Sequence, residues 1–526
     1  MSVRLTWVQP EDLIGHELRQ AVEDGRDASA VEARWRAAGG TPAPVAAGAS
    51  RAPAPPHLRA LAERLLDELA ALPVPLSAAE PTSLAHIRRI CPHWPRPAGP
   101  DTPRPGPILP RAPAPPPGAG TAAAAAPPGP PAPSGAAHPP ARDTPHAPDT
   151  GAVAARPEAV APGPEAVAVA PGLGARLHAA WLGRAAGCLL GKPVEKLPLS
   201  AIRALAAATG NWPLTSWFTA RGLPPALAAA HPWNRRSAAT SLAENIDGMP
   251  EDDDLNYPLL NLLLLQRYGP GFRTADVARL WLEELPAGRT FTAERVAYRN
   301  LLSGLEPPLT ASHRNPFREW IGAQIRADVH GWTHPGDPAA AAEQAHRDAT
   351  LTHTANGVYG AMFTAAVIAT AASGTADVHR SLATGLAVVP PDSRLARAVR
   401  FGIATAHAHT DFDAVVDRLH AAYGSYHWVH VVPNTALLAA ALTHADGDFT
   451  LSVCRAVSGG WDTDSNGATA GSVAGLLAGR PESIPDRWTS PLKNRLATSV
   501  PTFDGTGFDT LAALTHRLAH QEAPRP

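Results

Sequence analysis

The sequence predicts an all-α protein. Long Ala- and Leu-rich runs repeat apolar residues every three and four positions, and alternating strand patterns are nearly absent. Glycine and proline separate these runs, as expected at helix ends. The periodic pattern continues from residue 173 to residue 520. We interpret this part as one helical domain of about 350 residues, which is large for a single core but not excluded.

Two different segments precede this domain. Residues 1–95 contain two amphipathic stretches, EDLIGHELRQAVEDGRD and HLRALAERLLDELAALP, so we expect a helical N-terminal region. Residues 96–172 form a Pro-, Ala- and Gly-rich tract without aromatic residues. Such a composition buries too little apolar surface to offset the entropy of ordering, and it predicts a disordered linker.

Composition excludes several classes of function. The formal net charge is −2, which gives no electrostatic reason to expect a nucleic-acid partner or an acidic membrane surface. The three cysteines show no paired spacing, and the first residues have no apolar segment typical of a signal peptide. The uncharged stretch 349–376 contains polar residues and favours a buried helix over a membrane span. We therefore expect a cytoplasmic protein without membrane partners.

Two acidic clusters stand out in the helical domain. EDDD (251–254) precedes the apolar run LLNLLLLQRY, and GWDTDSNGATAG (460–471) places Asp462, Asp464 and Ser465 ahead of small residues. Acids at a helix N-terminus favour the helix dipole, and this alone would explain one or two of them. Four adjacent acids repel one another, so the excess indicates a cation. Carboxylates and hydroxyls without cysteine suit Mg²⁺ or Mn²⁺.

Glycines recur every four positions behind the second cluster, at 467, 471, 475 and 479. They share one face of the predicted helix, and each costs about 1 kcal/mol relative to alanine. This cost is explained if a neighbouring helix approaches that face closely and brings further acids near Asp462 and Asp464. His427 and His430 have an HxxH spacing. A zinc pair is conceivable, but with no acid or cysteine nearby we favour histidines that pack or line a cleft.

Five segments in order resemble the ADP-ribosylglycohydrolase family, whose members are all-α enzymes related to dinitrogenase reductase-activating glycohydrolase. GRAAGCLLGKPVE (183–195) resembles the opening motif G-x-x-x-G-D-A-x-G-x-P-x-E, and EDDD falls where the family has T-D-D-T. IGAQIRADVHGW (321–332) resembles N-G-A-x-M-R-x-x-P-x-G, and 335–353 is similar to the segment ending in Thr-His. GWDTDSNGATAG resembles G-G-D-T-D-(T/S)-x-A-x-x-G, the most specific of the five. The resemblance spans residues 173–520.

The resemblance implies a function: two Mg²⁺ ions, with Mn²⁺ as the alternative, bind the ribose hydroxyls while water cleaves a glycosidic bond of an ADP-ribosylated protein or small molecule. The implied catalytic residues are Glu195 and Asp253. The implied metal ligands are Glu251, Asp252, Asp253, Asp462, Asp464 and Ser465. The implied substrate-binding residues are Gly322, Ala323, Arg326 and His353.

The chain departs from the family pattern at several positions. Cys188 stands where the family usually has Asp, Glu251 and Asp254 replace threonines, and Ile321 replaces an asparagine. These changes predict a divergent branch. The alternative function is a non-catalytic ADP-ribose-binding or structural protein on the same fold, because fold does not fix function.

Overall fold

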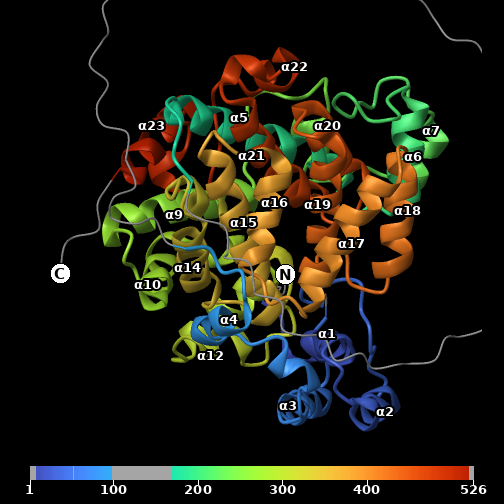
Figure 1. Cartoon of the computed structure of the whole chain (residues 1–526). Helices are drawn as coiled ribbons and strands as arrows, with labels where there is room; N and C mark the ends of the chain where they lie inside the picture. Colours follow the sequence, from blue (N-terminus) through green and yellow to red (C-terminus); the bar gives the residue numbers. More distant parts are fainter. Residues whose placement is uncertain (1–6, 51, 97–166, 521–526) are drawn as a thin grey trace, which may run out of the picture. The chain divides into compact units, whose positions relative to one another are not determined.

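The computed structural model describes residues 7–50, 52–96 and 167–520, and within these residues the chain forms helices and no β-strand (Figure 1). Two isolated backbone bridges, Met249 with Leu496 and Trp320 with His430, occur in the described part. The prediction of an all-α fold is therefore confirmed.

The described helices fall into two groups along the chain. The N-terminal group comprises α1 (Pro10–Glu23), α2 (Ser29–Ala37), α3 (Pro56–Ala70), the 3₁₀ turn η1 (Pro75–Ala78) and α4 (Leu84–Ile90). The second group begins with α5 (Leu173–Gly191), η2 (Lys192–Val194), α6 (Leu199–Ala208), α7 (Pro225–Ala230), α8 (Ala238–Ser241), α9 (Asp253–Tyr268), α10 (Thr274–Glu284), η3 (Ala287–Arg289), α11 (Thr292–Leu302), α12 (Leu309–Ser312), η4 (Ile321–Arg326) and α13 (Asp328–Trp332). It continues with α14 (Pro338–Ala349), α15 (Ala355–Ala372), α16 (Val378–Ala387), α17 (Arg394–Ala408), α18 (Phe412–Tyr423), α19 (Val431–Ala445), α20 (Phe449–Ser458), α21 (Thr463–Ala478), η5 (Pro481–Ser483), α22 (Asp486–Thr489), η6 (Ser490–Leu492), η7 (Pro501–Phe503) and α23 (Phe508–Ala519).

Helices α5 and α21 lie against each other with their backbones in contact. A Cβ atom on Gly187 would lie 1.8 Å from the carbonyl oxygen of Gly467, and one on Gly471 would lie 1.9 Å from that of Gly183. Only glycine fits at such a distance. The predicted close approach is therefore found, and α5 is the partner helix. Gly479 does not belong to this face, because it ends α21 with a φ of 83°, a left-handed conformation that glycine adopts readily.

This contact fixes the end of α5 beside the start of α21. The Thr463 hydroxyl donates a 2.8 Å hydrogen bond to the carbonyl oxygen of Gly191, the last residue of α5. A Cβ on Gly191 would lie 2.3 Å from the Thr463 backbone. The chain that continues from α5 into Glu195 is thereby held close to Asp462 and Asp464.

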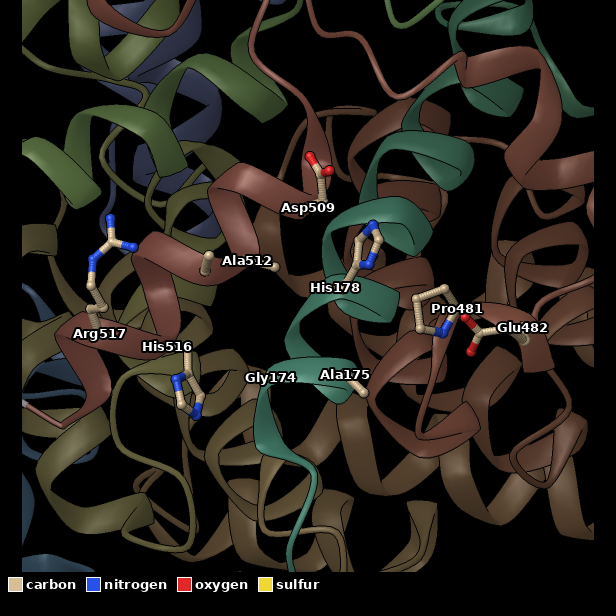
Figure 2. A pocket seen from close by; sticks show the side chains of 10 residues that line it. Gly174, Ala175, His178, Pro481, Glu482, Asp509, Ala512, His516 and Arg517 are labelled. Atoms are coloured by element: carbon tan, nitrogen blue, oxygen red, sulfur yellow. The ribbon is translucent and has the colours of Figure 1, made fainter. Parts of the chain in front are cut away.

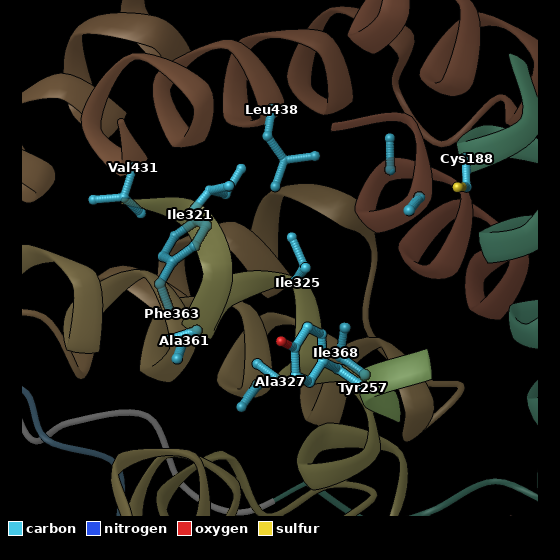
Figure 3. Packing of buried hydrophobic residues seen from close by; sticks show 14 of the residues in the cluster. Cys188, Tyr257, Ile321, Ile325, Ala327, Ala361, Phe363, Ile368, Val431 and Leu438 are labelled. Carbon is cyan, nitrogen blue, oxygen red and sulfur yellow. The ribbon is translucent and has the colours of Figure 1, made fainter. Parts of the chain in front are cut away.

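Helix α15 is the central buried helix, and the side chains of Figure 3 show how it packs. Phe363 and Ile368 lie among Ile325, Val431 and other apolar side chains of one continuous core. Within the described residues, α15 is the one helix long and apolar enough to cross a membrane, and 94% of its apolar window is buried inside the fold. Burial of this kind is what the sequence predicts for the stretch 349–376.

The N-terminal helices pack on the second group through buried ion pairs. Arg318 pairs with Glu17 at 2.8 Å and with Asp24 at 2.7 Å. Arg394 pairs with Glu80 at 2.6 Å. Residues 7–96 are thus joined to the helical domain by charged groups that are largely removed from water.

The predicted linker falls mostly outside the described residues. Its last residues are described and hydrogen-bonded: the Val167 amide donates to the Gly336 carbonyl at 2.9 Å, and the Ala170 amide to that of Ser373 at 2.8 Å. The described chain therefore joins the helical domain six residues before α5. The division of the chain into regions at 1–95, 96–172 and 173–520 stays a prediction.

Candidate active site

Three segments far apart in sequence meet at the end of α5. Asp252 is the N-cap of α9 and accepts a 2.9 Å hydrogen bond from the Asp254 amide. Asp462 is the N-cap residue of α21. Glu195 follows directly after η2. Two helix N-termini and one helix exit therefore gather carboxylates at one place, as the resemblance implies.

Asp252 is held by a lysine. Its Oδ2 forms a hydrogen-bonded ion pair with the Lys192 ammonium, and the two side chains are 8% and 9% exposed. Lys192 also donates to the carbonyl oxygen of Glu251 at 3.3 Å. Burial lowers the pKa of Lys192, but Asp252, Cys188 and Asp464 together raise it, so the pKa lies above its usual value. This aspartate is therefore neutralised from within the chain.

Asp254 lies deeper, among Arg184, Ser465 and Cys188. The Arg184 guanidinium donates to the Asp254 backbone oxygen at 2.8 Å and lies 3.3 Å from its carboxylate. The Ser465 hydroxyl donates to the Asp254 carboxylate at 3.3 Å. A ligand atom of Cys188 lies within 4.8 Å of carboxylate oxygens of Asp252 and Asp254. The residue that replaces a family threonine thus contacts the predicted metal ligand Ser465.

The remaining carboxylates face one another. Burial raises the pKa of Asp253 well above its usual value, and the charges of Asp252 and Asp464 raise it further. Burial and the neighbouring Asp464 likewise raise the pKa of Asp462. Burial and the Glu195 carboxylate raise the pKa of Asp464 to about 7. These shifts indicate an excess of negative charge that the described residues do not neutralise.

Glu195 is oriented from two sides. Asn234 donates a 2.7 Å hydrogen bond to its Oε2, and the Lys196 ammonium lies 2.7 Å from its Oε1. Its side chain is 18% exposed, so solvent or a ligand can reach it. The charge of Glu195 raises the pKa values of Asp253, Asp462 and Asp464, which places it in the same cluster.

Glu251 has different partners from those expected of a metal ligand. Its carboxylate pairs with Arg289 at 2.9 Å and accepts hydrogen bonds from Ser499 and, at 3.3 Å, from the Asn256 amide. The carboxylate is thus held by residues outside the cluster. The sequence could not show this, because Ser499 and Arg289 lie far away along the chain.

Arg326 is fully buried and its guanidinium is occupied by protein groups. It pairs with Asp348 at 2.8 Å and Glu294 at 2.9 Å, and it donates to the Thr352 hydroxyl at 2.8 Å. The resemblance implies that this side chain contacts the substrate. The side chain is fully buried, however, and its donors are engaged by protein groups, so it cannot reach a substrate. Arg326 instead fixes the η4 loop from the interior of the fold.

The other predicted substrate-binding residues surround the same buried network. A Cβ on Gly322 would lie 2.2 Å from the Glu294 carboxylate, and Ala323 is fully buried. His353 is fully buried, and its Nδ1 lies 2.6 Å from the Thr352 hydroxyl. Burial lowers the pKa of His353 well below its usual value, so the ring is neutral. These residues shape the loop from inside the fold, and their side chains are removed from solvent.

Sequence reasoning missed two basic residues of the first motif, Arg184 and Lys192, that join these parts. Besides Asp254, Arg184 pairs with Asp328 at 3.0 Å and donates to the carbonyl oxygen of Ile325, so it connects α5 to α9, η4 and α13. Asn434 accepts a 3.1 Å hydrogen bond from the Asp462 amide. Lys192 and Arg184 both lie in the first motif. The sequence feature that could have identified them is an isolated basic residue within an apolar run.

A surface groove of about 570 Å³ lies elsewhere, between the start of α5 and α23 (Figure 2). His178, Glu482, Asp509 and Arg517 are among its lining residues, and none of the predicted site residues is. Gly174 and Glu195 are separated by most of the length of α5, about 25 Å at 1.5 Å per residue. The groove is therefore distinct from the carboxylate cluster.

An all-α domain with buried carboxylates at two helix N-termini is the class of protein that fold and site define. The sequence model of the family described as ADP-ribosylglycohydrolase matches residues 170–525. The chain belongs to the ADP-ribosylglycohydrolase family, as the five motifs predict. No curated protein matches the chain. One solved structure named "ADP-ribosylglycohydrolase-related protein complex" is 21% identical, with 66% of this chain and 100% of the other covered and a TM-score of 0.43.

The donor set can be compared with the divalent ions that the family resemblance implies. Among the described residues, no ion pair engages the carboxylates of Asp253, Asp462 or Asp464. Burying unpaired carboxylates is costly, and a divalent cation with oxygen ligands would remove that cost. These three carboxylates are of the chemical kind that suits Mg²⁺ or Mn²⁺. The ligand atoms that lie within 4.8 Å of one another in the described part are, however, those of Cys188, Asp252 and Asp254. Asp252 fits less well, because Lys192 already neutralises it.

Proposed function

We propose that this chain is a metal-dependent hydrolase that cleaves the glycosidic bond of ADP-ribosylated proteins or small molecules. One observation carries the proposal: besides burial, Asp464 raises the pKa of Asp253 and Asp462, Glu195 raises the pKa of all three aspartates, and none of the three has a cationic partner in an ion pair among the described residues. Membership of the glycohydrolase family supports the reaction class. A single cluster of hard oxygen ligands beside one further carboxylate suits hydrolysis at a sugar.

The residues of the cluster divide the work. Asp253, Asp462 and Asp464 would hold the ion, with the Ser465 hydroxyl beside them. When bound, Mg²⁺ or Mn²⁺ would polarise the ribose hydroxyls and lower the pKa of a water molecule. The chain contributes the fixed geometry, because the contact between α5 and α21 holds the carboxylates in place before substrate binds.

Glu195 would act as the general base. Asn234 and Lys196 orient its carboxylate, and its charge raises the pKa values of Asp462 and Asp464, which supports a role beside the ion. From there it would accept a proton from water as that water attacks the anomeric carbon and oxocarbenium character develops. The leaving group would be the modified side chain or small molecule.

The backbone of the η4 loop is the candidate contact for the ribose-phosphate part of the substrate. Arg326 fixes this loop through Glu294 and Asp348, and these two carboxylates neutralise its charge inside the fold. A buried, fully paired arginine positions backbone amides without contacting the ligand. Changes at Arg326 should therefore reduce stability as well as substrate binding.

The test is release of free ADP-ribose from ADP-ribosylated arginine peptide, serine peptide and nucleotide, measured with Mg²⁺ present. Asp462→Asn removes one ion ligand while keeping size, and we expect the rate to fall by more than about 100-fold, beyond the loss typical of groups outside the ligand set. Asp392→Asn, at an exposed aspartate, is the matched control and should retain the rate. Equal rates for Asp462→Asn and wild type would rule out the hydrolase.

A non-catalytic ADP-ribose-binding or structural protein on the same fold is the second candidate. The pairing of Asp252 with Lys192 and the presence of Cys188 beside Asp254 favour it, because both change the first ion position. Calorimetry distinguishes the two functions. Tight binding of ADP-ribose by a protein that releases none from any of the three substrates would support the binding role.

A further inference from the structure

Lysine is rare in this chain, and two of its three lysines lie at the carboxylate cluster. Lys192, Lys196 and Lys493 are the lysines of the 526-residue sequence, in which arginine supplies the other basic side chains. An ammonium is a compact point charge, whereas a guanidinium is a wide planar fork. At Asp252, the ammonium of Lys192 is therefore closer to a metal ion in size and shape than a guanidinium would be.

The position of Lys192 is set by backbone contacts. It begins η2 directly after Gly191, where the backbone of α5 touches Thr463. From there its ammonium contacts the Asp252 carboxylate and, at 3.3 Å, the Glu251 carbonyl oxygen. One carboxylate oxygen and one carbonyl oxygen are also ligands typical of a hard divalent ion.

The acids of the cluster fall into two sets: those with a basic partner and those without one. Asp252 pairs with Lys192, Asp254 with Arg184 at 3.3 Å, and Glu195 with Lys196 at 2.7 Å. Asp462 and Asp464 are 6% and 7% exposed, and in the described part neither they nor Asp253 forms an ion pair. Only the second set therefore has carboxylates available for a metal.

We propose that the Lys192 ammonium occupies one of the two cation positions of this centre, at the Asp252 carboxylate, so that the centre takes a single divalent cation. In known two-ion sites the ions lie about 3.5–4 Å apart, and a fixed ammonium at Asp252 would repel a second divalent ion there. The inference rests on the proposed function only in that both require a divalent cation. It changes the number of ions from the two that the resemblance implies.

Manganese counting tests this directly. The full chain, stripped of metal, is titrated with Mn²⁺, and the bound ion is followed by calorimetry and electron paramagnetic resonance. Wild type should bind one Mn²⁺ with the six-line spectrum of an isolated ion. Lys192→Met should bind two, with the broadened spectrum of a coupled pair. Two coupled ions in wild type, or none, would overturn the proposal, as would a single ion in folded Lys192→Met.

Two further variants keep the result interpretable. Lys493→Met removes a lysine that also pairs with an aspartate, Asp247, but on the exposed surface, and it should bind one ion like wild type.

The double variant Lys192→Met/Asp252→Asn removes both buried charges together, so it tests the proposal even if Lys192→Met alone unfolds. It should bind one Mn²⁺ with affinity within about threefold of wild type, a change of less than 1 kcal/mol. Loss of the ion would show that Asp252 is a ligand and overturn the proposal.

The count is independent of the hydrolase assignment. If no ADP-ribose is released but the Mn²⁺ counts are one for wild type and two for Lys192→Met, the ion inference stands and the reaction class fails. If ADP-ribose is released by a wild-type protein holding two coupled ions, the reaction class stands and the role of Lys192 fails.

Discussion

At the scale of single residues, the chemistry of the cluster depends on which carboxylate has a cationic neighbour. Asp252 and Asp253 are adjacent in sequence, yet the first has its pKa lowered by Lys192, against the effect of burial, and the second has its pKa raised by burial and by like charges. His427 and His430 show the same dependence on neighbours. His427 Nε2 lies 2.9 Å from the Val45 carbonyl oxygen, and His430 accepts the Val432 amide at 3.2 Å, so both rings are buried and hydrogen-bonded inside the fold. The expectation that no acid lies near them is wrong for His430, whose Nε2 lies 3.4 Å from the Glu23 carboxylate.

The raised pKa values predict that divalent-ion affinity increases with pH. A carboxyl must lose its proton to bind a metal, and the Asp464 pKa is about 7 in the metal-free protein. Below this pH protons compete with the ion, and above it they do not. One such group gives about a tenfold tighter Mn²⁺ dissociation constant at pH 8 than at pH 6, and the other raised carboxyls add to it. Calorimetry at constant ionic strength measures this, and equal affinities at both pH values would contradict it.

At the scale of elements, the site is built by one helix contact and two helix N-termini. Gly187 and Gly467 allow α5 and α21 to touch, and this fixes Asp462 near Glu195. An N-terminus favours acidic residues through its free amides and dipole, so the two acidic motifs are stable at the starts of α9 and α21. Local preference and long-range packing therefore agree at this site.

The helix contact predicts a sharp difference between two glycines. A Cβ on Gly467 would lie 2.2 Å from the Gly187 carbonyl oxygen, whereas one on Gly174 would lie 3.7 Å from the nearest atom, in His516. Gly467→Ala should lower the free energy of unfolding by about 1–3 kcal/mol, because overpacking outweighs the gain in helix propensity. Gly174→Ala should leave it unchanged or raise it. Urea unfolding followed by circular dichroism measures both, and equal effects would argue against a backbone contact.

At the scale of the whole molecule, the N-terminal helices are tied to the domain by a buried ionic network. Arg394 contacts Glu80 at 2.6 Å, Glu319 at 2.8 Å and Asp24 at 3.5 Å. Two of these acids come from the N-terminal region and one from the loop before η4. The positive charge of Arg394, which belongs to the helical domain, is thus neutralised at this face by two acids of residues 7–96 together with Glu319.

Removing this arginine should loosen the N-terminal region. Arg394→Met leaves buried acids unpaired and should cost about 3–5 kcal/mol of stability. Hydrogen exchange should show α1 and the 80–90 segment losing protection first. Arg397→Met, on the exposed face of the same helix α17, is the matched control and should change neither. Equal protection of α1 in both variants would show that the region docks independently of Arg394.

The sequence by itself determined the helical class, the family and the positions of the acidic motifs, because periodicity, glycine spacing and motif order are local properties of the chain. It also predicted that a helix must approach Gly467 and Gly471 closely. Only the tertiary structure decided the partners of each charge: Lys192 for Asp252, Arg289 for Glu251, and Glu294 with Asp348 for Arg326. These partners come from distant segments, and the energy of a buried charge is set by whatever the fold brings within a few ångströms, which no local pattern records.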